Sequence, residues 1–197
     1  RWYDGPDRAR FAKLTNALLL SLRGNPILFQ GEELGLPQAE VPFEQLQDPE
    51  AIANWPRTLG RDGARTPMPW THDAHMAGFT AGTPWLPVGQ GHAAVAADAQ
   101  ETKSDSVLNF TRHVLNLRGL SPALTLGDIA FEDLDPPLLA FRRVQGDEKV
   151  LCVFNLGATS RPRPDCMPPD ATVLAASGWD GEFLGDVPEY SVWIGRL

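Results

Sequence analysis

The feature that most constrains the fold is a long stretch without periodicity, from Leu36 to about Thr102. It is rich in proline and glycine, and only a weak helical pattern at residues 44–54 interrupts it. Irregular connections longer than about 15 residues are uncommon in compact domains and are usually functional. We therefore expect this stretch to be a functional loop held between regular elements.

A helix is predicted on each side of the long loop. The first covers residues 6–24, where Asp4 or Pro6 can begin the helix and Gly24 can end it. The second begins near Ser104, with Ser104 or Asp105 as its cap. Their apolar stripes at helical spacing are Phe11, Leu14, Leu18 and Leu22 in the first, and Val107, Phe110, Val114 and Leu117 in the second.

Strands are predicted in two places. A short apolar run, Ile27 to Phe29, precedes a polar segment and reads as a buried strand that opens into the loop. After Leu124 the segments LLAFRRV, KVLCVFNL, TVLAAS and YSVWIGRL are short and β-rich, which predicts a small antiparallel domain, expected to be a sandwich. A strand followed by a long loop and a helix is how a β/α barrel builds its active-site face.

Composition narrows the function classes. The chain has 197 residues and a net charge of −8, which argues against nucleic acid and anionic membranes as partners. No apolar run approaches the roughly 20 residues of a membrane helix. Cys152 and Cys166 are too few for a disulfide framework, so we expect a reducing, cytoplasmic setting. Because Arg1 follows no start methionine or signal peptide, we expect a cut end there.

Four segments in a fixed order carry a resemblance to a known family: GNPILFQGEELGLP at 24–37, GRDGARTPMPW at 60–70, WLPV at 85–88 and SVLNFTRHVLNLRGLSPAL at 106–124. The chain resembles the C-terminal part of an α-glucosidase of the α-amylase superfamily (glycoside hydrolase family 13), in its oligo-1,6-glucosidase branch. RTPMPW with the preceding Arg-Asp pair is specific to this branch.

This resemblance implies an α/β barrel followed by an all-β domain. Residues 1–121 would be the last part of a (β/α)8 barrel, namely helix 7, strand 8, the long loop and helix 8, and residues 122–197 the C-terminal antiparallel β-sandwich. The family's nucleophile, acid/base and third carboxylate precede Arg1 in chain order, and no Asn-His-Asp motif occurs here. Retaining hydrolysis needs two carboxyl groups about 5 Å apart. We therefore expect no catalytic residue in this chain, and no activity from this chain alone.

The resemblance also suggests residues that bind substrate. In the family, the first arginine of the GRDGARTPMPW segment reaches the bound sugar, and that position is Arg61. Glu32 and Glu33 follow the predicted strand, so they are expected to line the same pocket, with a turn cap or a buried ion pair as the alternative. Arg65 is expected to be buried and to tie down the loop, and Asp62 to cap the loop or pair with an arginine.

Other side chains of the loop are expected to have mainly structural roles. Prolines 67 and 69 should stiffen it, while Met68 and Trp70 should pack it down. His72 and His75 lack a third ligand nearby, so neither a metal nor a cofactor is expected. Three aromatic residues could stack on a second sugar ring or could simply pack: Phe43, Phe79 and Trp85.

Three functions remain open. The first is a retaining α-glucosidase that removes terminal α-linked glucose from short oligosaccharides, with small α-glucosides and the upstream part of the same protein as partners. The second is a transglycosidase of the same family that isomerises sucrose. The third is a noncatalytic fragment that binds carbohydrate or another protein. The intact RDGARTPMPW segment favours an enzyme.

Overall fold

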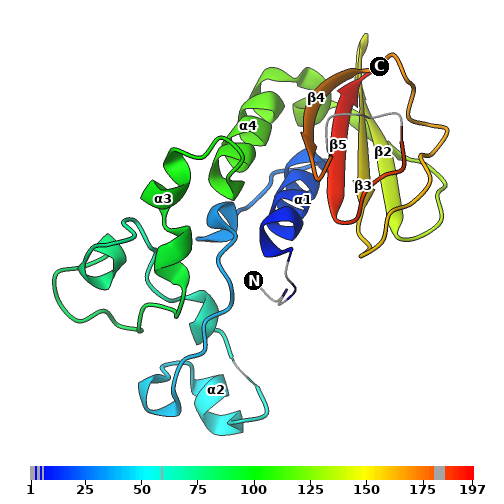
Figure 1. The fold of residues 1–197 in the computed structure, drawn as a ribbon. Helices are drawn as coiled ribbons and strands as arrows, with labels where there is room; N and C mark the ends of the chain where they lie inside the picture. Colours follow the sequence, from blue (N-terminus) through cyan, green and yellow to red (C-terminus); the bar gives the residue numbers. More distant parts are fainter. Residues whose placement is uncertain (1–2, 4, 6, 59, 180–184) are drawn as a thin grey trace. The chain divides into compact units, whose positions relative to one another are not determined.

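The computed structural model describes the chain except for residues 1–2, 4, 6, 59 and 180–184 (Figure 1). The chain divides into two compact units, one made of residues 1–6 and 28–109 and the other of residues 7–27 and 110–197. The domain boundary predicted after residue 121 differs from this division and stays a prediction.

The second unit combines helices with one sheet. Its helices are α1 (Arg8–Ser21), the later part of α4 (Val107–Leu120) and α5 (Pro122–Leu126). Its strands are β1 (Asp128–Phe131), β2 (Leu138–Gln145), β3 (Glu148–Asn155), β4 (Thr172–Ser177) and β5 (Ser191–Arg196). All pair antiparallel in the order β1-β2-β3-β5-β4, which confirms the predicted antiparallel domain.

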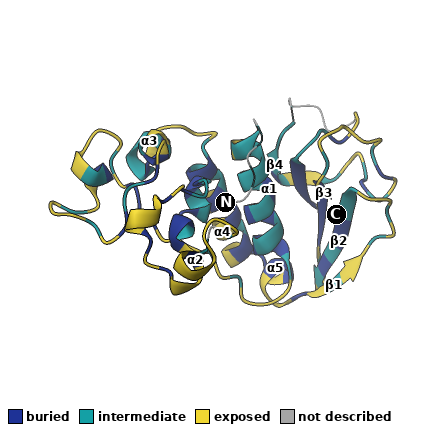
Figure 2. Ribbon diagram, turned by 90° about the horizontal axis from the view of Figure 1, so that it is seen from below, coloured by how far each residue is buried: buried dark blue, intermediate teal, exposed yellow. Residues whose placement is uncertain are grey.

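Both faces of the central strands are buried, although the described strands form a single sheet. One face carries Ala140, Leu151, Val153 and Trp193, which pack with Met167 from a segment without strand structure. On β3 the alternate residues Val150, Cys152 and Phe154 are also buried, and α1 contacts β3, β4 and β5. Figures 1 and 2 show α1 beside the sheet, and Figure 2 shows β1 largely exposed at its edge. Helix and loop therefore cover the two faces.

Two buried arginines bind the C-terminal end of α1. Arg118 donates to the carbonyl oxygens of Leu20, Leu22 and Gly24, at 2.6, 3.0 and 2.5 Å. Arg143, which is completely buried, donates to the carbonyl oxygen of Ser21 at 2.6 Å. Since the last carbonyls of a helix have no partner within it, these side chains satisfy groups that would otherwise lie unpaired.

The first unit consists mainly of short elements joined by irregular chain. They are η1 (Glu32–Leu34), η2 (Phe43–Gln45), α2 (Pro49–Asn54), η3 (Asp62–Ala64), η4 (His75–Gly78), η5 (His92–Val95) and α3 (Ala97–Glu101), where η denotes a 3₁₀ turn. Two small apolar clusters hold it together. One contains Leu34, Leu36, Met68 and Leu108, and the other Val41, Leu46, Ala51 and Leu86.

The predicted helices are present with altered limits. The first helix ends at Ser21, before Gly24, and the proposed starts Asp4 and Pro6 lie outside the described residues. In the second helix, neither Ser104 nor Asp105 provides the cap, because the N–H of Asn109 donates to the hydroxyl of Ser106 at 3.1 Å. The buried positions of α1 are Leu14, Asn16, Ala17, Leu20 and Ser21, a stripe rotated from the predicted one.

The predicted strand at Ile27 to Phe29 is wrong for the described chain. These residues have no strand structure, and Ile27 is 83% exposed. A strand requires a hydrogen-bonded neighbour, and no described strand of this chain pairs with the segment. Across the described residues, no helix combines the length and apolar character needed to cross a bilayer.

Candidate functional site

The segment at residues 60–70 is held mainly by backbone contacts. The Asp62 carboxylate accepts hydrogen bonds from the N–H groups of Gln47 at 2.7 Å and Asp48 at 2.8 Å, so the predicted loop cap is confirmed. The N–H of Ala39 donates to the carbonyl of Gly63 at 3.0 Å. A Cβ at Gly63 would lie 2.2 Å from the carbonyl oxygen of Ala39, so only glycine allows this approach.

The apolar side chains of this segment divide between core and surface. Pro67 and Pro69 are buried, and Met68 packs into a cluster of the first unit as predicted. Trp70, in contrast, is exposed, so the expectation that it packs the loop is wrong. The Gln30 amide donates to the carbonyl of Thr66 at 3.1 Å, which ties the segment before η1 to this loop.

Arg61 is fixed by Asp48. Its Nε donates to Oδ2 of Asp48 at 2.9 Å and its Nη2 to Oδ1 at 2.6 Å, while its backbone N–H donates to the same Oδ2 at 2.8 Å. The Asp48 side chain is completely buried, whereas that of Arg61 is 61% exposed. The hydrogen bonds from the Arg61 guanidinium hold the pKa of Asp48 well below its usual range. The bidentate contact therefore fixes one edge of the guanidinium and leaves Nη1 outside it.

The sequence analysis did not identify Asp48 as a site residue, although the sequence contains a signal of a helix N-terminus there. It precedes Pro49, and an aspartate before a proline at the first helical position is typical of a helix N-terminus. The structure shows this cap, with the N–H of Glu50 donating to Oδ1 of Asp48 at 3.3 Å. The same carboxylate thus begins α2 and orients Arg61.

The position of Arg65 shows that the expected roles of Arg61 and Arg65 were wrong in part. It was predicted to be buried and to tie down the loop, but it is exposed and forms no ion pair with a described residue. The buried Asp48 carboxylate instead binds both the backbone and the side chain of Arg61. Arg61 therefore has the loop-fixing contact, and its predicted sugar contact stays a prediction.

The two glutamates after Gln30 lie in different surroundings. Glu32 accepts the N–H of Phe29 at 2.9 Å, which is the contact of a turn cap. Glu33 is half-buried, and no hydrogen bond or ion pair to it is found among the described residues. Both lie in the same unit as Arg61. Their predicted place in a substrate pocket is untested by these contacts.

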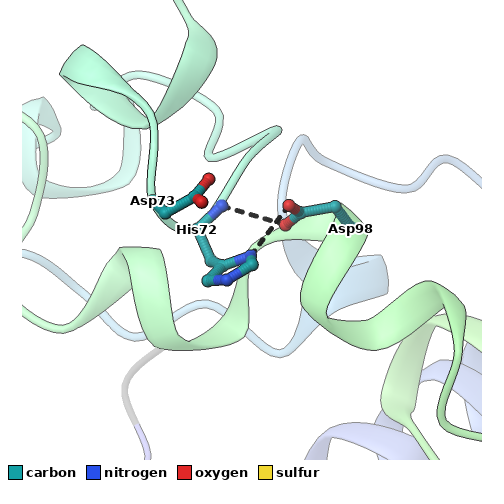
Figure 3. A group of neighbouring side chains, drawn as sticks. All are labelled: His72, Asp73 and Asp98. Atoms are coloured by element: carbon teal, nitrogen blue, oxygen red, sulfur yellow. Dashed lines mark hydrogen bonds and ion pairs between the residues drawn. The ribbon is translucent and has the colours of Figure 1, made fainter.

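A second polar group joins His72, Asp73 and Asp98 (Figure 3). The backbone N–H of His72 donates to Oδ1 of Asp98 at 2.9 Å, and Nδ1 of His72 lies 2.8 Å from Oδ2. Hydrogen bonding to Asp98 raises the pKa of His72. One ligand atom from each residue lies within 4.8 Å of the others, which is close enough for a cation. The contacts already made by Asp98 explain the arrangement as a link between the loop and α3.

With this geometry described, comparison with known proteins identifies the class. Residues 3–127, more than half of the chain, match the family described as "Alpha amylase, catalytic domain". The chain therefore belongs to the α-amylase family, as the sequence motifs predicted.

Relatives agree with this assignment. The chain is 47% identical over 157 residues to a probable α-glucosidase of Rhizobium meliloti (strain 1021), covering 79% of this chain and 28% of the relative. It is 31% identical over 172 residues to an oligo-1,6-glucosidase of Parageobacillus thermoglucosidasius, covering 77% and 30%. The chain thus spans less than a third of these relatives' length.

Solved structures extend the similarity to nearly the whole chain. The α-glucosyl transfer enzyme XgtA is 41% identical with a TM-score of 0.84, covering 99% of this chain and 37% of that one. The trehalulose synthase MutB of Pseudomonas mesoacidophila MX-45 is 28% identical with a TM-score of 0.85, covering 98% and 39%. The predicted fold class, a partial barrel with a β domain, is supported by these neighbours.

Proposed function

We propose that the complete protein to which this chain belongs is a retaining α-glucosidase that removes terminal α-linked glucose from short oligosaccharides. The observation that carries the proposal is Arg61, an exposed guanidinium held by a buried carboxylate within the branch-specific segment of an α-amylase family member. Its substrates are then small α-glucosides of the maltose, isomaltose or sucrose type.

In this proposal Arg61 is an oriented donor. Asp48 occupies its Nε and one N–H of Nη2, so the remaining N–H groups can donate to a sugar hydroxyl. A donor fixed before substrate binds needs little rearrangement during the reaction, and loss of such a donor typically lowers the rate about 10²–10³-fold. Glu33, and Glu32 beside its turn, are proposed to line the same pocket.

The proposed nucleophile and acid/base lie in the upstream part of the protein. Because retaining hydrolysis needs both carboxyl groups, we propose that this chain alone is inactive. Purified complete protein should release p-nitrophenol from p-nitrophenyl α-glucoside, whereas the 197-residue chain should not. Turnover by the isolated chain would contradict the proposed division of the site.

Arg61 variants of the complete protein test the contact itself. We expect Arg61→Ala to lower kcat/KM about 10²–10³-fold and also to lower the melting temperature, because it leaves the buried Asp48 carboxylate unpaired. Arg61→Lys keeps the charge beside Asp48 but removes the planar fork, so it should retain more stability than activity. Arg65→Ala is the matched control and should change neither. Near-normal kinetics in both Arg61 variants would refute the assignment.

A transglycosidase that isomerises sucrose is the second candidate. The similarity to a trehalulose synthase and to an α-glucosyl transfer enzyme favours it. Product analysis with sucrose distinguishes the two: hydrolysis yields glucose and fructose, and isomerisation yields a new disaccharide. A complete protein that acts on neither substrate would leave the noncatalytic carbohydrate-binding or interaction role.

A cytoplasmic location is also proposed. Cys152 and Cys166 form no disulfide, which is usual for a reducing compartment. Fractionation of the producing cells tests this location, and recovery of the protein outside the cytoplasm would contradict it.

A further inference from the structure

The first unit contains a cavity of about 480 Å³, and its lining residue Gln47 is hydrogen-bonded to Asp62 in the Arg61 segment. One side is formed by Glu44, Gln45 and Gln47, and Met76 completes the lining. The other side is formed by Thr83, Pro84, Trp85, Pro87 and Val88. The volume falls within the range of roughly 300–1,000 Å³ that is usual for small-molecule sites. It is therefore large enough to hold an organic ligand.

Both sides of this cavity rest on one apolar cluster. Leu46, between two lining residues, and Leu86, next to Trp85, are buried together with Val41 and Ala51. The N–H of Gln47 donates to the same Asp62 carboxylate that caps the Arg61 segment. Because these anchors fix the backbone on both sides, the cavity is formed before any ligand binds, and preorganisation of this kind favours binding.

The lining chemistry suits a neutral polyhydroxylated ligand. Trp85 is 64% exposed despite its size, and its flat, electron-rich face can pack against the C–H groups of a sugar ring. Glu44 offers acceptors, while the amides of Gln45 and Gln47 offer both donors and acceptors for hydroxyl groups. The described lining contains neither lysine nor arginine, which disfavours phosphate and carboxylate ligands.

Backbone conformation provides an additional observation. Met76 and its neighbour Ala77 both have left-handed conformations, with φ of 47° and 52°. Such conformations are unfavourable for a residue other than glycine and cluster at ligand sites. Here the turn that contains them brings Met76 to the cavity lining.

The structure also separates the three aromatic residues that the sequence left equivalent. Phe43 packs against Trp55, with ring centroids 5.8 Å apart, and Phe79 is exposed without lining the cavity. Trp85 alone among the three lines the cavity.

We propose that this cavity, the Trp85 pocket, binds a further glucose unit of an α-linked oligosaccharide, beyond the unit that is cleaved. Trp85 packs against the ring, and the Glu44, Gln45 and Gln47 side chains hydrogen-bond its hydroxyl groups. The inference rests on the proposed α-glucosidase function, because it assigns the protein a preference for longer substrates.

Substrate length provides the test in the complete protein. We expect Trp85→Ala to raise KM about five- to tenfold for an α-linked glucotriose, which corresponds to about 1–1.4 kcal/mol. The variant should hydrolyse p-nitrophenyl α-glucoside, which has one sugar unit, as the wild type does. Phe79→Ala is the matched control, since Phe79 is exposed outside the cavity, and it should change neither substrate.

Each of the other outcomes refutes the proposal that the Trp85 pocket binds a glucose unit. An unchanged KM for the trisaccharide means that Trp85 does not bind sugar, and equal losses on both substrates mean general damage to the site. A lower melting temperature without any effect of substrate length means that the protein itself fills the cavity. If the wild type fails to hydrolyse either substrate, the proposed function fails. Calorimetric titration of wild type and Trp85→Ala with the same trisaccharide then decides the pocket separately: weaker binding by the variant supports it, and absent or equal binding refutes it.

Discussion

Replacement of Arg118 by methionine should destabilise the second unit strongly. Arg118 is 8% exposed and donates to three carbonyl oxygens at and just beyond the end of α1, those of Leu20, Leu22 and Gly24. Methionine fills much of the same space without a donor. The carbonyl of Leu20 then stays buried without this partner, while the two partly buried carbonyls can recover water.

The magnitude follows from these unequal losses. Hydrogen bonds to a charged donor contribute about 1.5–3 kcal/mol each, and a buried group left unsatisfied costs about 1–3 kcal/mol. One complete loss and two partial ones therefore predict a decrease of about 2–4 kcal/mol in the free energy of unfolding. For a chain of this size, that corresponds to a melting temperature lower by roughly 4–16 °C.

Thermal unfolding followed by circular dichroism measures this decrease in the 197-residue chain. Arg23→Met is the control, because Arg23 pairs with Asp128 at 3.2 Å on the surface, where an ion pair contributes about 0–1 kcal/mol. Arg118→Lys should give an intermediate result, since lysine lacks the planar fork that reaches several carbonyls together. If Arg118→Met melts within error of Arg23→Met, the carbonyl contacts do not stabilise the end of α1 and the reasoning fails.

Three further predictions concern the first unit. Asp62→Ala should lower the melting temperature by removing the acceptor of two backbone N–H groups, and Asp62→Asn, which keeps one oxygen, should lower it less. Gly63→Ala should also lower it, because its Cβ would collide with a carbonyl oxygen; a melting curve like the wild type's would contradict this. Asp98 raises the pKa of His72 above the ordinary 6.5, so their contact contributes fully below about pH 6.5 and is lost as the pH rises through the raised pKa. NMR titration should show this inflection, and Asp98→Asn should lower it; an unchanged inflection would refute the coupling.

The predictable parts of the fold are those set by local pattern. Apolar residues at helical spacing located α1 and α4, because a helix buries one face whatever its neighbours are. The short β-rich segments separated by turn residues located the C-terminal strands. The segment at Ile27 shows the limit of this approach: an apolar run predicts burial, but strand structure depends on a paired neighbour that local sequence does not reveal.

Contacts between residues far apart in the chain could not be predicted from the sequence. Arg118 lies 98 residues from the carbonyl of Leu20 that it binds, and Arg143 lies 122 residues from that of Ser21. An arginine inside an apolar stripe reads as a surface residue, because a single sequence does not show which unsatisfied carbonyl it will meet. The Trp85 pocket was hidden for the same reason, since its two sides come from segments almost 40 residues apart that share an apolar cluster.

The two arginines of the GRDGARTPMPW segment show how a motif can locate a site without assigning its roles. Both have the same charge and the same donors, but Arg61 binds Asp48 and Arg65 does not. Asp48 is buried at the start of α2, and it accepts the backbone N–H of Arg61 as well as two bonds from its guanidinium. Arg65 forms no such ion pair with a described residue and is exposed. A directional contact with a sugar hydroxyl needs a donor whose position is fixed before the ligand arrives. Of the two, Arg61 meets this condition because the contact that fixes its position leaves part of its guanidinium free to donate.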